Sequence, residues 1–512
     1  MNCRAALLIL VAVSCSRGPS NLPDPATVDR YVSEFNASDE ELYHEHWAND
    51  SAAEFLKSQI PLFECPDKEV EKTYYFRWWV YRKHIRLTDG GYVVTEFMPD
   101  VFWAGPHNTI NCPAMMHIAE GRWLRDKSIV RDYLKFWSTP DSGVRNYSFP
   151  VADAAWQYYL VSRDSLLLSE MLPFLKDNYA AWEADRRDSI GLFWQRDLLD
   201  GMECSVSGKM AEDWTGYRPT INSYMYADAR AIARISHDDL YNAKADTLKS
   251  LMDSLLWDSQ KQFYMAVPRH SGMARCPSRE LIGYVPWEYG LPDRDKLSCW
   301  LQISDTCGFN APFGPTTVER RSPGFAVRHE PDPEGFGAQW NGPVWPFATT
   351  QTLGALAETL RRYGETEYAD RLTFFNLFRT YSYSQRMGDV CWIDENQDPF
   401  TGEWILRRIN ADRGSTSQSG KDYNHSSYAD ILISDLVGIQ PQENGSIAIE
   451  PLIPEGEWDW FCLSGVSVCG HEITVLYDRT GSRYGCGRGL SVFADGKMAA
   501  HQKGLRPCVC VF

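Results

Sequence analysis

The sequence lacks the features that mark nucleic-acid-binding, zinc-binding and membrane-embedded proteins. Acidic residues outnumber basic ones, 68 to 51, and lysine and arginine form no long run. Cysteine and histidine form no CxxC pair and no spacing typical of zinc ligands. After residue 20, no segment approaches the roughly 18 unbroken apolar residues of a membrane-spanning helix. We therefore expect no nucleic-acid partner, no metal site and no internal membrane span.

The first twenty residues have the pattern of an export signal. Arg4 precedes an apolar run from Ala5 to Val13, which is too short to span a bilayer as a mature helix. Ala12-Val13-Ser14-Cys15 also resembles a bacterial lipobox, in which Cys15 is lipidated after cleavage. Ordinary signal-peptide cleavage is the alternative. We predict an exported periplasmic, outer-membrane or cell-surface lipoprotein whose only membrane contact is this N-terminal anchor.

Aromatic residues are abundant, at 13% of the chain, with 19 Trp and 26 Tyr. Such a surplus is common in proteins that stack sugar rings, because an indole face matches the apolar face of a pyranose. An aromatic-rich core is the alternative explanation. The 44% of hydrophobic residues is ample for a large core.

Helical periodicity dominates from about residue 50 to 437, in segments that come in pairs. The clearest pairs are 151–162 with 165–183, 222–236 with 240–256, and 343–362 with 366–381, and weaker helices are predicted at 69–84, 113–137 and 426–437. Without a short sequence repeat, this pattern predicts a toroid of helical hairpins rather than a solenoid. Four long loops, which we expect to gather around a pocket, connect the hairpins: 85–112, 191–221, 264–342 and 386–425.

After Gly438 the pattern changes to short alternating stretches punctuated by turns, with Ala494-Asp495-Gly496 as a predicted hairpin tip. We therefore predict three parts. These are a signal peptide at 1–20, an α-helical toroid at 21–438 and a β-rich lobe at 439–512.

Two of the long loops carry acids where apolar segments end. In LFWQRDLLDGMECSVSG these are Asp200 and Glu203, and CWIDENQDPFTGEW contains Glu395 among four acids. Hydrolysis of a glycosidic bond needs one protonated and one ionised carboxyl, and desolvation favours the protonated form. Solvated acidic turns are the alternative for both clusters. Calcium is not expected, because Pro399 and Ile405 break the similarity of the second cluster to an EF-hand loop.

Three segments resemble glycoside hydrolase family 63 and the mannosylglycerate hydrolase group, in the same order along the chain. Asp200-Gly201-Met202-Glu203 is similar to the turn that carries the general acid in that family. Glu395-Asn396-Gln397-Asp398-Pro399-Phe400-Thr401-Gly402 resembles the segment whose glutamate is the general base. Trp340-Asn341-Gly342-Pro343-Val344-Trp345 is similar to a segment that lines the sugar site.

The resemblance implies an (α/α)6 barrel and an inverting glycosidase for α-glucosides or α-mannosides that needs no cofactor. It implies Glu203 as the acid and Glu395 as the base, with carboxyls about 6.5 to 9.5 Å apart. The chain differs from the family at two places: Glu203 replaces an aspartate, which leaves Asp200 as an alternative acid, and Asn341 replaces an arginine.

Loop position and residue type suggest further contacts with an oligosaccharide or glycoside substrate. These candidates are Trp103, His107, Asp200, Tyr284, Trp287, Trp340, Asn341, Trp345, Tyr423 and His425. Local packing is the alternative for each.

Two other functions fit parts of the sequence. A surface lipoprotein that binds glycans would share the lipobox and the tryptophans, but it has no need for paired acids in separate loops. A toroidal polysaccharide lyase would need basic residues against a uronate, whereas the loops here carry more acids than bases near the motifs, which suits neutral sugars.

Overall fold

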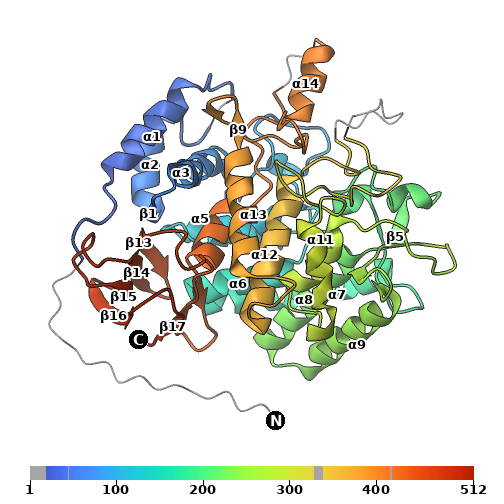
Figure 1. The fold of residues 1–512 in the computed structure, drawn as a ribbon. Helices are drawn as coiled ribbons and strands as arrows, with labels where there is room; N and C mark the ends of the chain where they lie inside the picture. The colour runs from blue at the N-terminus through green and yellow to red at the C-terminus, as the bar shows by residue number, and fades with distance from the viewer. Residues whose placement is uncertain (1–18, 44, 328–337, 415–417) are drawn as a thin grey trace.

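The computed structural model describes residues 19–43, 45–327, 338–414 and 418–512, so the predicted lipidation site Cys15 lies outside the described residues. Helices are the main regular elements before residue 437, and strands are the main regular elements after it (Figure 1). The longer helices are α1 (Ala26–Ala37), α2 (Ala52–Gln59), α3 (Lys68–Lys83), α4 (Ala114–Gly121), α5 (Ser128–Trp137), α6 (Val151–Ser162), α7 (Ser165–Arg186), α8 (Pro219–Ser236), α9 (Asp239–Leu255), α12 (Pro346–Tyr363), α13 (Arg371–Ser384) and α14 (Ile405–Asp412).

The three predicted hairpins are α6 with α7, α8 with α9, and α12 with α13. Local sequence explains their turns. Arg163 adopts a left-handed conformation after α6, and the Asp164 carboxylate caps α7 by accepting a hydrogen bond from the Leu167 N–H. Asp370 caps α13 in the same way through the Thr373 N–H. These caps satisfy backbone donors that a helix start leaves unpaired.

The segment 113–137, predicted as one helix, contains two helices, α4 and α5. The break follows Gly121, where an added Cβ atom would lie 2.3 Å from the Tyr81 hydroxyl. The Lys127 ammonium then donates to the carbonyls of Arg122 and Leu124, at 2.6 and 2.8 Å. A basic side chain thus satisfies carbonyl groups in the segment between the two helices.

Strands β11 to β17 form most of the C-terminal lobe, and they lie to one side of the helical body (Figure 1). Its main sheet has the order β1-β13-β14-β15-β16, so β1 (Leu62–Glu64) joins it from the N-terminal part of the chain. At the predicted hairpin tip, Asp495 and Gly496 both have positive φ, which suits a tight two-residue turn. The strands are β11 (Ile439–Pro441), β12 (Ile447–Ile449), β13 (Trp460–Val468), β14 (His471–Asp478), β15 (Gly489–Ala494), β16 (Lys497–Gln502) and β17 (Cys508–Cys510).

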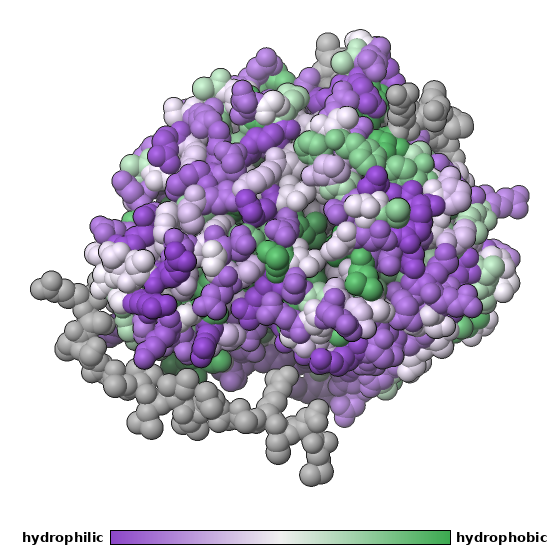
Figure 2. Space-filling model, viewed as in Figure 1, coloured by the Kyte–Doolittle hydropathy of each residue, from purple (hydrophilic) through white to green (hydrophobic). Residues whose placement is uncertain are grey.

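Most buried apolar residues pack into one continuous core that joins the helices to the C-terminal sheet, and a small separate cluster forms around Leu476 and Phe493. The face shown in Figure 2 is mostly hydrophilic, with apolar side chains gathered in a few patches. Among the described residues, no helix has the length and apolar character to cross a membrane. The cysteines of the described part of the chain form no disulfide, and eight of these twelve are buried.

Short elements give shape to the long loops. Loop 85–112 begins with the hairpin β2 (Ile85–Thr88) and β3 (Gly91–Val94). Loop 191–221 contains β4 (Gln195–Arg196), the 3₁₀ turn η3 (Leu198–Asp200) and β5 (Thr215–Tyr217). Loop 264–342 contains the 3₁₀ turn η5 (Leu281–Tyr284) and the short helix α10 (Val285–Glu288). After the last loop, the predicted helix 426–437 consists of the short helix α15 (Tyr428–Asp430) and the π-helix η7 (Ile431–Leu436). The loops therefore hold their side chains in defined positions.

Candidate active site

All four long loops contribute to the wall of a cavity of about 410 Å³ that we call the glutamate cavity. Its wall contains three glutamates, Glu96, Glu203 and Glu395, which come from separate loops. Six of the predicted site residues lie on this wall: Trp103, Glu203, Trp340, Trp345, Glu395 and Tyr423.

The turn that carries Glu203 is held by its own polar groups. The Asp197 carboxylate accepts from the Leu198 N–H at 2.7 Å and from the Ser205 hydroxyl at 3.1 Å. Gly201 has φ +73°, and a Cβ atom there would lie 2.8 Å from the Cys112 sulfur. Only glycine fits this close approach. The turn is thereby fixed with Glu203 facing the cavity.

Trp340 connects to Glu203 twice. Its indole Nε1–H donates to the Glu203 carboxylate at 2.8 Å, and its backbone N–H donates to the Glu203 carbonyl at 2.9 Å. The first bond orients the carboxyl group, and the second joins the two loops. The two segments that resemble the same family are therefore in direct contact in the structure.

The loop of Glu395 is joined to the same segment. Gln397 and Val344 exchange two backbone hydrogen bonds of 2.9 and 3.0 Å. The Asp398 carboxylate accepts from the N–H groups of Phe400 and Thr401, at 2.9 and 3.1 Å, and so closes the acidic turn. Residues 340–345 therefore hold both predicted catalytic loops.

Glu96 follows strand β3 and is 6% exposed. Its carboxylate accepts a hydrogen bond from the Tyr423 hydroxyl, and its carbonyl accepts from the Asn424 N–H at 3.1 Å. The segment 423–424 thus fixes both the side chain and the backbone of Glu96.

Burial controls the electrostatics of the three glutamates. It raises the pKa of Glu203 to about 7, although the hydrogen bond from Trp340 acts in the opposite direction. It raises the pKa of Glu96 to about 8, again against the hydrogen bond from Tyr423. The pKa of Glu395 is raised well above its usual range by burial and then by the charges of Glu203 and Glu96. All three carboxyls therefore favour the protonated form more than an exposed glutamate does.

Aromatic side chains line the cavity and continue to its mouth. Inside, Trp340 and Trp345 stack with ring centroids 4.3 Å apart. Toward solvent, the Phe97 ring packs against Tyr423 and Trp103, with ring centroids 4.8 and 5.6 Å apart, respectively. Trp103 is 44% exposed and its neighbour Phe102 is 96% exposed. This gradient marks the direction in which a bound molecule would extend toward solvent.

Two predicted sugar contacts are core residues instead. Tyr284 and Trp287 are buried outside the cavity, where Tyr284 stacks on Trp300 at 4.3 Å and donates to the Cys299 carbonyl at 2.9 Å. Tyr284 ends η5 and Trp287 lies in α10, and both of these elements pack against α12.

The other four predicted contacts also lie away from the cavity wall. His107 is exposed beside Phe136, at 6.1 Å. Asn341 is buried and donates to the Gly324 carbonyl at 3.2 Å. His425 lies behind the wall, with its ring centroid 3.6 Å from that of Tyr423.

Asp200, the alternative acid, is buried in an ion pair. Its Oδ2 atom lies 2.8 Å from Arg218 Nε and also accepts from the Thr220 hydroxyl. This position does not support either a catalytic or a sugar-binding role.

Sequence reasoning missed several residues of the wall, including Glu96, Phe97, Phe102, Cys112, Tyr147 and Leu406. One signal was present for Glu96. It directly follows the apolar strand Gly91–Val94 and Thr95, as Glu203 follows an apolar run. The remaining residues carry no local pattern that distinguishes them from core residues.

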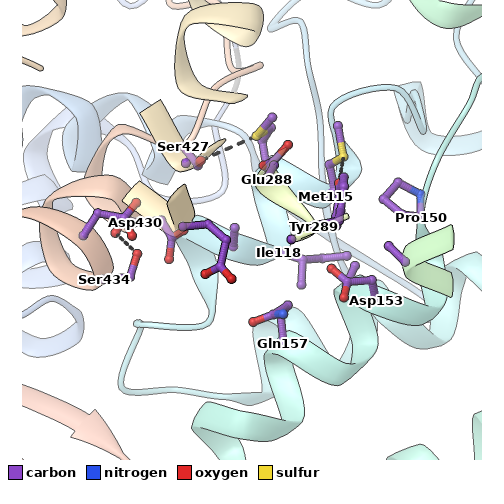
Figure 3. Close-up of a pocket in the computed structure, with 18 of the residues that line it drawn as sticks. Met115, Ile118, Pro150, Asp153, Gln157, Glu288, Tyr289, Ser427, Asp430 and Ser434 are labelled. Atoms are coloured by element: carbon purple, nitrogen blue, oxygen red, sulfur yellow. Dashed lines mark hydrogen bonds between the residues drawn. The ribbon is translucent and has the colours of Figure 1, made fainter. Parts of the chain in front are cut away.

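A second cavity of about 520 Å³ is lined by α4, α6, α8, α10, α12 and η7 (Figure 3). It also contains acids, among them Asp153, Glu288 and Asp430. Here, however, Arg122 lies 2.7 Å from Asp430, and Arg361 pairs with Asp435. None of the predicted site residues lines this cavity. In the described part of the chain, no cluster of His, Cys, Asp and Glu has a geometry that could hold a metal ion.

The family of the chain follows from its sequence. The model of the mannosylglycerate hydrolase MGH1-like glycoside hydrolase domain matches residues 105–426, which is more than half of the chain and includes Glu203 and Glu395. The chain belongs to this glycoside hydrolase family. The resemblance inferred from the three motifs is thereby confirmed, and of the three functions considered from sequence the family supports hydrolysis of glycosides.

Solved structures extend the comparison of this MGH1-like protein. One named "Sialidase" is 37% identical with a TM-score of 0.88; the match covers 96% of this chain but only 45% of that one. The GH63 mannosylglycerate hydrolase from Thermus thermophilus in complex with glucose is 15% identical, with a TM-score of 0.53, over 70% of this chain and 98% of its own. The GH78 rhamnosidase of Bacillus sp. GL1 is 15% identical, with a TM-score of 0.54, and the match covers 85% of this chain and 41% of the rhamnosidase. The last two matches show similarity of fold.

Proposed function

We propose that this MGH1-like protein hydrolyses α-linked glucosides or mannosides with inversion at the anomeric carbon, with Glu203 as general acid and Glu395 as general base. The observation that carries the proposal is that two half-buried carboxyls from separate loops face one aromatic-lined cavity. The residue types and their positions on the family's motifs support the two roles.

In the proposed reaction, Glu203 donates its proton to the glycosidic oxygen as the C1–O bond breaks. Glu395 removes a proton from a water molecule, whose oxygen forms the new bond to C1 from the opposite face. The products are a free sugar of inverted configuration and the protonated leaving group. Because each ionised carboxyl raises the pKa of the next, the two glutamates lose their protons in separate steps, and between these steps the pair holds one proton. The proposed roles require this proton to lie on Glu203, a placement that the charge of Arg407 near Glu395 favours.

The Trp340 indole supports this assignment, because it donates to the Glu203 carboxylate and so stabilises the ion that forms when the acid loses its proton. Glu395 must be ionised to act as the base, although burial raises its pKa. The guanidinium of Arg407 lowers this pKa and so favours the ionised form.

We also propose that the hairpins form an (α/α)6 barrel, with the glutamate cavity at one end and the second cavity at the other. The helical segments around the second cavity, in which α15 and η7 are contiguous, and the fold similarity to the GH63 enzyme support this architecture. Export through the N-terminal signal, with lipidation of Cys15, remains part of the proposal.

Proton NMR of the first product tests the mechanism. The protein should release the β-anomer from an α-glucoside or α-mannoside before mutarotation. A released α-anomer would contradict inversion, and an absence of hydrolysis for α-glycosides of both sugars would contradict the substrate class.

A further inference from the structure

The glutamate cavity contains a third carboxyl group, Glu96, that the proposed acid and base do not require. It is almost fully enclosed, and its remaining surface lies on the cavity wall. The Tyr423 hydroxyl and the Asn424 N–H hold its side chain and backbone in place. Glu96 is therefore a fixed polar group beside the space where the sugar would bind.

The charges on the cavity wall have one sign. Among the described residues that line it, there are three carboxyls and no lysine, arginine or histidine. Arg407 does not line the cavity: its Nε atom lies 2.5 Å from Asp394 Oδ2, and from there its charge acts on Glu395. Because the pKa of Glu203 is about 7, the cavity carries negative charge at and above neutral pH.

This charge distinguishes neutral from acidic ligands. A sugar hydroxyl can donate a hydrogen bond to a buried carboxylate. An acidic group on the same sugar would lose its hydration beside a like charge, without a cation to compensate. The penalty grows with each further carboxyl that ionises.

We propose that Glu96 is a specificity-determining residue, which makes the glutamate cavity accept neutral sugars and reject sugars that carry an acidic group. The hydrolysis of such sugars rests on the proposed function, whereas the binding preference does not depend on it.

A pH dependence distinguishes this role from a structural one. Burial raises the pKa of Glu96 to about 8, so its charge appears mainly above neutral pH. The titratable groups that interact with Glu96 are Glu203, Glu395, Cys112, Tyr133, Tyr147 and Tyr423. The pKa values of the thiol and of the three phenols are raised, so these groups stay neutral while Glu96 ionises.

Calorimetry with two pairs of methyl α-glycosides tests the proposal: glucoside with glucuronide, and mannoside with mannuronide. In at least one pair, the neutral sugar should bind at least about tenfold more tightly than its acidic partner at pH 7. The ratio of their dissociation constants, acidic over neutral, should increase at pH 9. Glu96→Gln keeps an oxygen for the Tyr423 hydroxyl but cannot ionise. Its ratio should increase less between pH 7 and pH 9 than that of the wild type, because only Glu203 and Glu395 can still ionise.

The matched control is Glu403→Gln, because Glu403 is exposed and paired with Arg408 at 2.9 Å. This variant should keep the wild-type ratios at both pH values. Equal binding within both pairs, including no binding of any of the four sugars, would overturn the proposal, as would an unchanged pH dependence in Glu96→Gln. Selective binding without hydrolysis would contradict the proposed function and leave the role of Glu96 standing.

Discussion

The two cavities of this protein both enclose carboxyl groups, but they differ in the partners of those groups. In the second cavity, Asp430 and Asp435 are paired with arginines. In the glutamate cavity, Glu203 and Glu96 accept hydrogen bonds from the neutral donors Trp340 and Tyr423. A guanidinium fixes a carboxylate in its ionised form, whereas a neutral donor leaves it able to gain and lose a proton near neutral pH.

Burial alone does not distinguish the two cavities. It raises the pKa of Asp435 to about 6 despite the Arg361 charge, and it raises the pKa of Glu288 well above its usual range. The informative difference is therefore that the glutamate cavity places its acids among aromatic side chains without an arginine on its described wall, whereas several arginines line the second cavity. Variants of each cavity can test this distinction.

The largest effect is expected for Glu395→Gln. Removal of the base should lower kcat by about a thousandfold or more at every pH, because water then lacks a proton acceptor. Sugar binding, followed by tryptophan fluorescence, should remain because the aromatic wall is intact. Turnover similar to that of the wild type would remove Glu395 from its proposed role.

Glu203→Gln should have an effect that depends on the leaving group. Hydrolysis of an alkyl glycoside needs a proton on the departing oxygen, whereas a nitrophenolate leaves without one. We expect a loss of kcat of about a hundredfold or more for methyl α-glycosides and a much smaller loss for nitrophenyl α-glycosides. Equal losses for both would indicate that Glu203 does not donate the proton.

In the second cavity, Arg122→Met should reduce stability rather than catalysis. The variant leaves Asp430 buried with only the Trp123 indole as a donor, at 2.6 Å. The free energy of unfolding should fall by about 3 kcal/mol in urea denaturation, with kcat/KM of the folded protein nearly unchanged. Adding Asp430→Asn should restore part of the stability, and a large loss of kcat/KM at full stability would contradict the distinction between the cavities.

The pH profile provides a finer test of the neutral donor at Glu203. Because the acid must be protonated, kcat/KM should fall as the pH rises through the pKa of about 7. Trp340→Phe removes a bond that favours the ionised form, so this decline should move to higher pH by up to about one unit. Trp194→Phe, outside the cavity, is the control. An identical shift of the kcat/KM decline in both variants would show that the Trp340 indole does not set the pKa of Glu203.

Much of this organisation could be predicted from local sequence. Helical periodicity identified the hairpins, because each has an apolar face and a capped start such as Asp164 before α7. Acids at the ends of apolar segments identified Glu203 and Glu395. The same signal was present at Glu96, but no sequence motif there indicated that it had more than a local role.

The remaining wall depends on contacts between distant segments. Tyr284 and Trp287 were predicted from loop position and residue type alone, whereas Trp340 and Trp345 also lie in a segment similar to the sugar-site motif of the family. Residue type cannot separate them, because the direction of each side chain is set by partners far along the chain. Gln397, for instance, joins its loop to Val344.

The smallest effect is expected for Glu288→Gln, which removes an enclosed acid from the second cavity. Its pKa is raised in the folded state, so the folded protein retains a proton that the unfolded chain loses, and wild-type stability falls as the pH rises above the unfolded pKa of about 4.3. Glutamine removes this dependence. The variant should therefore gain more thermal stability at pH 8 than at pH 5, with kcat/KM within about twofold of the wild type. A loss of activity as large as that of Glu203→Gln would show that enclosed acids matter to the reaction wherever they lie, and the difference between the two cavities would lose its functional meaning.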